Sequence, residues 1–177
     1  MRKLFFKNSL FLLFGLLGFS TLWAQGLERG TGVTANASQV YFELGGPGII
    51  YSFNYDGRFG KYENGIGFRI GVGGASVNGD GYVAVPFQLN YLAGSRGKYL
   101  EIGMGATYDS GLDLFGERDT QNGGSNHYTY GTFTIGFRKQ PLGRKGFTFR
   151  AAFSPIISFN GGGSFLPFAG VSWGIKF

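Results

Sequence analysis

The sequence predicts an all-β protein whose eight antiparallel strands close into an up-and-down barrel. Three observations predict this fold: eight segments with two-residue alternation, a high glycine content and a high aromatic content. Glycine makes up 34 of the 177 residues, aromatic residues 18% and charged residues 15%. Each glycine disfavours a helix interior by about 1 kcal/mol, and this aromatic content excludes a disordered chain. The absence of cysteine excludes a disulfide scaffold and a thiolate zinc site.

The N-terminal residues 1–24 have the pattern of a secretory signal peptide. Arg2, Lys3 and Lys7 precede an apolar run at 10–19, and Ala24 offers a cleavage site. The run is shorter than the ~20 residues that a membrane-spanning helix needs. We therefore expect a signal peptide at 1–24, a short segment at 25–37 and a barrel over 38–177. Cleavage would lower the net charge from +6 to +3, and without a later basic run we expect no nucleic-acid partner.

The first four predicted strands alternate between apolar residues and small or polar ones, as strands with one apolar face do. They lie at residues 38–45, 49–59, 66–75 and 82–93. In the second, Ile49, Tyr51, Phe53 and Tyr55 share one face. The Gly-Pro-Gly sequence at 46–48 is interpreted as a turn, and a bulge inside one long strand stays an alternative.

The last four predicted strands alternate in the same way. They lie at residues 99–108, 127–139, 147–154 and 165–177. A polar stretch at 109–126 and a glycine-rich loop at 160–164 separate them. Glycines at 71–74 and 103–105 are interpreted as inward positions where larger side chains would not fit.

The composition of the two strand faces separates a membrane barrel from a soluble one. The polar face is mostly Gly, Ser, Thr, Ala and Asn, which suits the narrow interior of an eight-stranded barrel. The other face is rich in Phe, Tyr, Leu, Ile and Val, and would form an apolar band against lipid. Aromatic residues near strand ends fit interfacial girdles. They are Tyr51, Tyr55, Tyr91, Tyr108 and Trp173. The sequence thus predicts a transmembrane barrel, with a soluble periplasmic barrel as the competing fold.

The chain ends in an alternating segment at 171–177 with the sequence Val-Ser-Trp-Gly-Ile-Lys-Phe. With the leader and the eight alternating segments, it resembles the small eight-stranded outer-membrane β-barrel proteins of Gram-negative bacteria, of the OmpX and OmpA-barrel kind. The resemblance implies a monomer in the cell outer membrane, in contact with lipid and lipopolysaccharide. It also implies that Trp173, Ile175 and Phe177 form the signal that the barrel-assembly machinery recognises.

An even-stranded barrel of this kind has both termini on the periplasmic side. Counting back from the C-terminus predicts four outward connections and three periplasmic turns. The outward connections are residues 46–48, 76–81, 109–126 and 155–164. The periplasmic turns are residues 60–65, 94–98 and 140–146.

Charged residues on the polar face form the candidate site, a polar network in the lumen. They are Glu43, Asp56, Arg58, Arg69, Glu101, Arg138 and Arg150. Lys176 shares this face. Unpaired charge in a narrow interior is unfavourable, so we expect these residues to pair. The preferred interpretation is a plugged lumen, and the alternative is a narrow channel or carrier for small molecules.

No motif indicates an enzyme, a cofactor or a metal. His127 lies near Ser125, but the Gly-x-Ser-x-Gly and His-Glu-x-x-His motifs are absent, so a lipid-modifying enzyme is the least favoured hypothesis. The acidic residues from Asp109 to Asp119 lack EF-hand spacing and are interpreted as a solvated loop. We expect a structural or surface-interaction role without catalysis or a cofactor.

Overall fold

The computed structural model describes residues 37–77, 80–111, 114–115, 127–143, 145–159 and 164–177. The predicted signal peptide and nearly all of the predicted segment 25–37 lie outside these residues. The described chain is almost entirely β-strand, with one short 3-10 turn, η1, at Gly46–Gly48. Within the described residues, no helix is long and apolar enough to cross a membrane.

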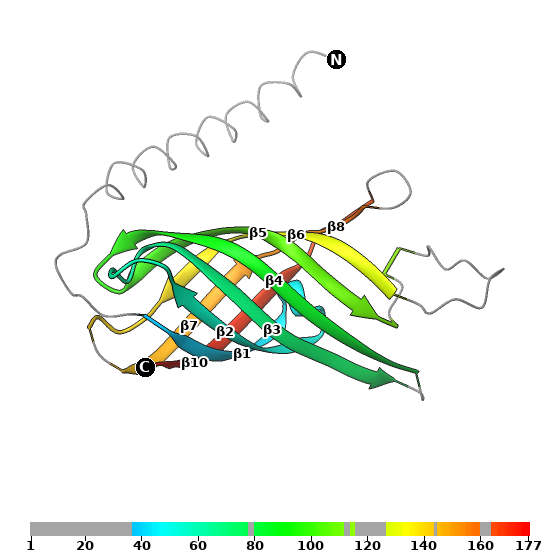
Figure 1. Ribbon diagram of the computed structural model, residues 1–177, viewed down its shortest axis with the longest axis horizontal. Helices are drawn as coiled ribbons and strands as arrows, with labels where there is room; N and C mark the ends of the chain where they lie inside the picture. The colour runs from blue at the N-terminus through cyan, green and yellow to red at the C-terminus, as the bar shows by residue number, and fades with distance from the viewer. Residues whose placement is uncertain (1–36, 78–79, 112–113, 116–126, 144, 160–163) are drawn as a thin grey trace, which may run out of the picture.

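The described strands follow one another along the chain with short connections at the end of the molecule that carries the C-terminus. They are β1 (Gln39–Gly45), β2 (Tyr51–Arg58), β3 (Gly65–Val77), β4 (Asp80–Ser95), β5 (Lys98–Ser110), β6 (His127–Lys139), β7 (Gly146–Phe153), β8 (Ile156–Ser158), β9 (Phe165–Leu166) and β10 (Ala169–Lys176). Figure 1 shows them as long, tilted ribbons around one axis.

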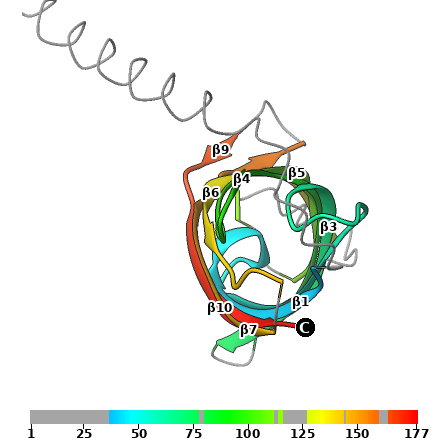
Figure 2. The same cartoon turned by 90° about the vertical axis from the view of Figure 1, so that its left-hand side faces the viewer.

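The strands close into a barrel because β10 pairs with both β7 and β1. From β1 to β7 each strand pairs antiparallel with the next. The short β8 extends the line of β7 against β6, and β9 pairs with β8. Counting β7 with β8 and β9 with β10 gives eight wall strands, which form a closed ring in the end view of Figure 2. The predicted closed eight-stranded antiparallel barrel is confirmed.

The seventh and eighth wall strands are interrupted, which the alternation did not predict. The expected loop at 155–164 contains β8, and the expected continuous strand at 165–177 divides into β9 and β10. Pro155 and Pro167 stand at the two breaks, where a residue without an N–H cannot donate to the ladder. Backbone bonds still cross this region, because Ser154 N donates to the Phe168 carbonyl oxygen at 2.7 Å.

The two faces of the wall follow the predicted alternation. Apolar side chains such as Phe53, Ile66 and Trp173 are exposed on the outside, whereas the buried charged residues lie on the opposite face of the same strands. The five predicted girdle residues are also exposed outside. The wall therefore encloses a polar interior within an apolar surface, the reverse of a water-soluble protein.

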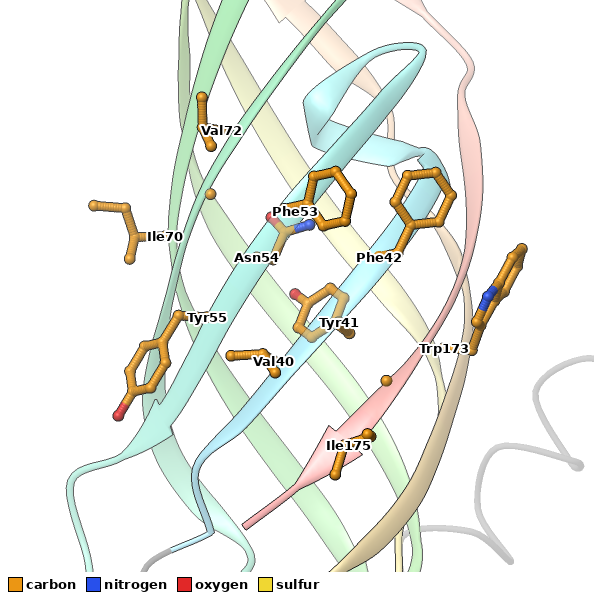
Figure 3. Close-up of a pocket in the computed structure, with 12 residues that line it drawn as sticks. Val40, Tyr41, Phe42, Phe53, Asn54, Tyr55, Ile70, Val72, Trp173 and Ile175 are labelled. Carbon is orange, nitrogen blue, oxygen red and sulfur yellow. The ribbon is translucent and has the colours of Figure 1, made fainter.

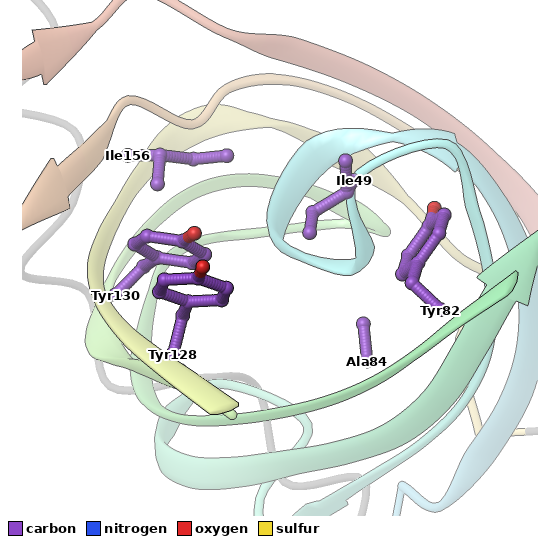
Figure 4. Close-up of a cluster of buried hydrophobic side chains, with 6 residues drawn as sticks. All are labelled: Ile49, Tyr82, Ala84, Tyr128, Tyr130 and Ile156. Carbon is purple, nitrogen blue, oxygen red and sulfur yellow. The ribbon is translucent and has the colours of Figure 1, made fainter. Parts of the chain in front are cut away.

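The connection between β1 and β2 differs from the prediction. It is a turn and not a bulge, but it folds into the barrel instead of outward, and all three residues of η1 are buried (Figure 4). Ile49, predicted on the outer face, is only 3% exposed and joins the interior. Gly45 and Gly46 have φ values of 73° and 69°, a region that favours glycine and that here directs the chain inward.

Candidate functional site

The seven charged residues predicted for the lumen all lie inside the barrel, each no more than 9% exposed. We call them the charged layer. They come from six different strands and are Glu43 on β1, Asp56 and Arg58 on β2, Arg69 on β3, Glu101 on β5, Arg138 on β6 and Arg150 on β7. The alternation places them on the inner face, and the tilt of the strands brings them to neighbouring depths.

Asp56 is the centre of the charged layer. Arg138 from across the barrel binds it with two parallel bonds, Nη1 to Oδ1 at 2.9 Å and Nη2 to Oδ2 at 2.8 Å. Arg58 Nη2 donates to Oδ1 at 2.7 Å, and Asn90 Nδ2 donates to Oδ2 at 2.7 Å. The bidentate geometry is the strongest form of guanidinium–carboxylate contact, so this residue ties β2, β4 and β6 together.

Glu101 forms the second carboxylate contact of the layer. It accepts a bond from Arg138 Nε at Oε2 and one from Arg150 Nη2 at Oε1, both at 2.9 Å. Asn90 Nδ2 also reaches Oε1 at 3.3 Å. Because Arg138 binds both Asp56 and Glu101, the two carboxylates share one guanidinium and form a continuous network.

Glu43 is the third carboxylate of the charged layer, and its surroundings differ from those of Asp56 and Glu101. Arg69 Nη2 binds its Oε2, while Arg150 Nη1 lies 4.0 Å from Oε1. The ring of Tyr41 lies beside both arginines, with centroid distances of 5.5 Å to Arg69 Cζ and 4.8 Å to Arg150 Cζ. Tyr41 was not predicted, although its position two residues before Glu43 on the same face was readable from the alternation.

A separate ion pair closes the interior at the C-terminal end of the barrel. Lys176 Nζ binds Glu63 Oε1 and donates to the Pro141 carbonyl oxygen at 2.8 Å. Glu63 Oε2 accepts from the Tyr99 hydroxyl at 3.2 Å. Sequence reasoning missed Glu63, because it lies in the turn between β2 and β3, where alternation carries no information. The pair joins two turns to the last strand, and we call it the rim ion pair.

Replacing Lys176 with methionine is expected to lower the free energy of unfolding by about 2–3 kcal/mol. The carboxylate of Glu63, 5% exposed, would lose its only charged partner within the described residues, and a buried charge without a partner is strongly unfavourable. Urea unfolding of the micelle-bound barrel measures the loss. Lys139→Met is the matched control, since Lys139 is an exposed lysine at the same end, and an equal effect of both changes would contradict the prediction.

The opposite end of the interior is filled by an apolar cluster. Ile49 from the inturned turn packs among side chains of β4, β6 and β8, as Figure 4 shows. The others are Tyr82, Ala84, Tyr128, Tyr130 and Ile156. The turn is fixed by hydrogen bonds as well, because Thr107 Oγ1 donates to the Pro47 carbonyl oxygen at 2.7 Å and Ile50 N donates to the Tyr82 hydroxyl oxygen at 3.0 Å. We call η1 with Ile49 the inner plug.

The outer face carries a shallow hollow of about 550 Å³ across β10, β1, β2 and β3 (Figure 3). Every residue that lines it is uncharged. The ring of Phe42 contacts those of Phe53 and Trp173, with centroid distances of 5.1 Å and 5.9 Å. Such a surface offers contact to hydrocarbon and carries no charged side chain.

The predicted assembly residues Trp173, Ile175 and Phe177 are exposed on this outer face. Phe177 N donates to the Ser38 carbonyl oxygen at 2.9 Å, so the chain end is held against the start of the barrel. In the folded barrel these three side chains therefore point towards the surroundings and contribute nothing to the charged layer.

Two other sequence hypotheses meet the structure only in part. Asp109 belongs to β5 and is buried, so its assignment to a solvated loop is wrong, while residues 113, 117 and 119 lie outside the described residues. His127 begins β6 and is exposed, and its Nδ1 lies 2.9 Å from the Tyr108 hydroxyl oxygen. Ser125 lies outside the described residues. Within the described part of the chain, no group of three or more His, Asp or Glu could hold a metal ion.

Comparison with known proteins adds one finding. No protein-family model and no curated protein matches the chain. The crystal structure of the N-terminal β-barrel domain of Pseudomonas aeruginosa OprF matches with a TM-score of 0.54, over 80% of this chain and 96% of that domain. The chain has the fold of an outer-membrane-type β-barrel. The sequence identity is 12%, so the likeness to OprF is one of fold, and it confirms the resemblance to small eight-stranded barrels.

Proposed function

We propose that the protein is an integral outer-membrane β-barrel with a closed lumen, whose role is structural or lies in surface interaction. It would reside in the bacterial outer membrane as a monomer, with its apolar face against lipid and lipopolysaccharide. The exposed Phe, Ile and Trp side chains of the wall support this placement, because water would disfavour them and hydrocarbon would not.

The observation that carries the closed lumen is the filling of the interior at three successive levels. The rim ion pair lies at the C-terminal end, the charged layer in the middle and the inner plug at the opposite end. Between the last two, Gln88 Nε2 donates to the hydroxyl oxygens of Thr132 and Thr134 at 3.0 and 3.1 Å. Side chains that bind one another across an eight-stranded barrel leave little room for a continuous water path.

The outward connections would then carry the surface role, and the C-terminal residues the assembly role. Trp173, Ile175 and Phe177 lie on one outward face at the end of the chain, where the barrel-assembly machinery could reach them during biogenesis. We propose no cofactor.

The test is planar-bilayer recording of the refolded protein, after gel mobility has shown that unboiled and boiled samples differ. We expect the mobility shift of a stable closed barrel and no conductance above the bare bilayer, with a porin of known conductance recorded in parallel. Steady unitary conductance would overturn the closed lumen and favour the channel alternative. The absence of a mobility shift, together with recovery in a periplasmic extract, would overturn the membrane barrel itself.

A catalytic role has a separate test. The third hypothesis, a lipid-modifying enzyme, requires His127, whose ring is stacked on Tyr108 at a centroid distance of 5.6 Å. Under the proposed function, His127→Ala leaves the lipid A profile of the host membrane unchanged, as mass spectrometry would show.

A further inference from the structure

Five residues lie at neighbouring inward-facing positions of the wall, and three of them belong to the charged layer. They are Tyr41 and Glu43 on β1, Arg69 on β3, Arg150 on β7 and Ser172 on β10. The strand register brings them together, because Glu43 pairs with Ser172 and Ser172 pairs with Arg150 across adjacent strands. The Tyr41 ring contacts both guanidinium groups, so the five side chains form one cluster.

Among the described residues, five polar groups of this cluster have no hydrogen-bond partner. One of them, Arg150 Nε, has a charged neighbour, because it lies 2.9 Å from Glu101 Oε2. The other four are the Tyr41 hydroxyl, Arg69 Nη1, Arg150 Nη1 and Ser172 Oγ. Each residue is at least 96% buried. All four groups can donate a hydrogen bond, and a buried donor without an acceptor is strongly unfavourable. Orphaned donors in one place indicate a missing acceptor, either water or an anion.

The charge of the layer distinguishes these two acceptors. Four guanidinium groups face three carboxylates, so the charged layer holds one positive charge in excess. The rim ion pair is balanced by itself. Asp109 is buried but lies eight residues beyond Glu101 on β5, about 26 Å further along the strand at the usual rise per residue. Water would satisfy the donors but would leave the charge uncompensated.

We propose that the barrel interior binds one small monovalent anion, of the chloride class, between Arg69 and Arg150. The hydroxyl groups of Tyr41 and Ser172 would complete its shell. One negative charge matches the excess of one positive charge, and the narrow interior favours a small, nearly spherical ion. Glu43 lies beside the site, and its binding to Arg69 limits the site to a single anion. This site goes beyond the proposed function and does not depend on it.

The experiment measures chloride binding to the full chain folded in nonionic micelles. ³⁵Cl line broadening is recorded for the wild type, for Tyr41→Phe/Ser172→Ala and for Tyr99→Phe/Ser154→Ala. The Tyr99→Phe/Ser154→Ala variant is the matched control. The two hydroxyl groups that it removes are buried in the same lumen and have partners in Glu63 and Thr134. We expect excess broadening in the wild type and the control. The site variant should bind at least about a hundredfold more weakly, as the loss of two hydrogen bonds to a charged group implies.

A second measurement keeps the proposal falsifiable if the site variant fails to fold. Wild-type crystals grown in bromide should give an anomalous peak within hydrogen-bond distance of Arg69 Nη1 and Arg150 Nη1. The absence of this peak overturns the proposal, and so does broadening that is equal in the wild type and the folded site variant. Peaks confined to exposed lysines would show surface binding only, which also overturns it.

Discussion

Replacing Asp56 with asparagine is expected to lower the free energy of unfolding by about 3–5 kcal/mol. The change keeps the shape of the side chain but removes the charge that binds Arg138 and Arg58. Both guanidinium groups are buried, so the excess positive charge of the layer would rise from one to two. The new amide nitrogen would also face guanidinium donors, which it cannot satisfy.

Urea unfolding in detergent micelles, followed by tryptophan fluorescence and gel mobility, measures this loss. The matched comparison is the double variant Asp56→Asn/Arg138→Met, which restores the wild-type charge balance of the layer. We expect the double variant to recover part of the stability. Equal midpoints for the wild type and the single variant would mean that the charged layer makes no net contribution to stability.

The seven residues of the charged layer were predictable because alternation assigns a face without any knowledge of the fold. Once a strand passes through Glu101 and Thr107, every second residue lies on the same side. The same parity includes Asp109, which is buried on β5. Its assignment to a loop was therefore an error in the strand boundary, and the pattern in the sequence was sufficient to correct it.

The pairing within the layer was not predictable, because alternation gives the face of a residue but not its depth. Asp56 and Arg138 are 82 positions apart and meet across the lumen. Their contact depends on the tilt and stagger of six strands, which a single sequence does not state. Glu63 shows a second limit of alternation as a guide. It contacts Lys176 from a turn, where side chains do not alternate between two faces.

The direction of the first turn was not predictable for a different reason. Glycine adopts positive and negative φ with similar ease, so the pair Gly45–Gly46 permits the chain to leave the barrel or to enter it. Ile49 then occupies an apolar position at the expected spacing, yet its side chain lies inside. A Cβ on Gly46 would come within 2.8 Å of the Glu43 carboxyl carbon, which shows how closely the inturned chain approaches the charged layer.

Replacing Ile49 with aspartate is expected to drive the inner plug out of the barrel. A carboxylate among Tyr82, Tyr130 and Ile156 has no cationic partner in that cluster, and burial of an unpaired charge is more unfavourable than exposure of a short turn. The chain contains no cysteine, so Pro47→Cys supplies a single thiol that reports the position of the turn. The measurement is the rate of labelling by a membrane-impermeant maleimide.

Pro47 is buried, so Pro47→Cys alone should be labelled slowly, and Pro47→Cys/Ile49→Asp rapidly. The rate should rise about tenfold for each 1.4 kcal/mol by which the outward position becomes favoured. Ile50→Asp in the same background is the matched control, because Ile50 is adjacent but 45% exposed, and it should leave labelling slow. Rapid labelling without any aspartate would show that the turn is not held inside.

The Ile49→Asp variant also shows which part of the interior blocks ions, the inner plug or the charged layer. Expulsion of the inner plug leaves Arg138 bound to both Asp56 and Glu101 below it, because none of these three contacts involves the turn. We therefore expect Ile49→Asp to increase labelling without opening a conductance in planar bilayers. If ion conduction rises together with labelling, the inner plug is the barrier to ions and the charged layer is permeable. If neither changes, the apolar cluster tolerates the charge and the turn is held chiefly by the Thr107 and Tyr82 hydrogen bonds.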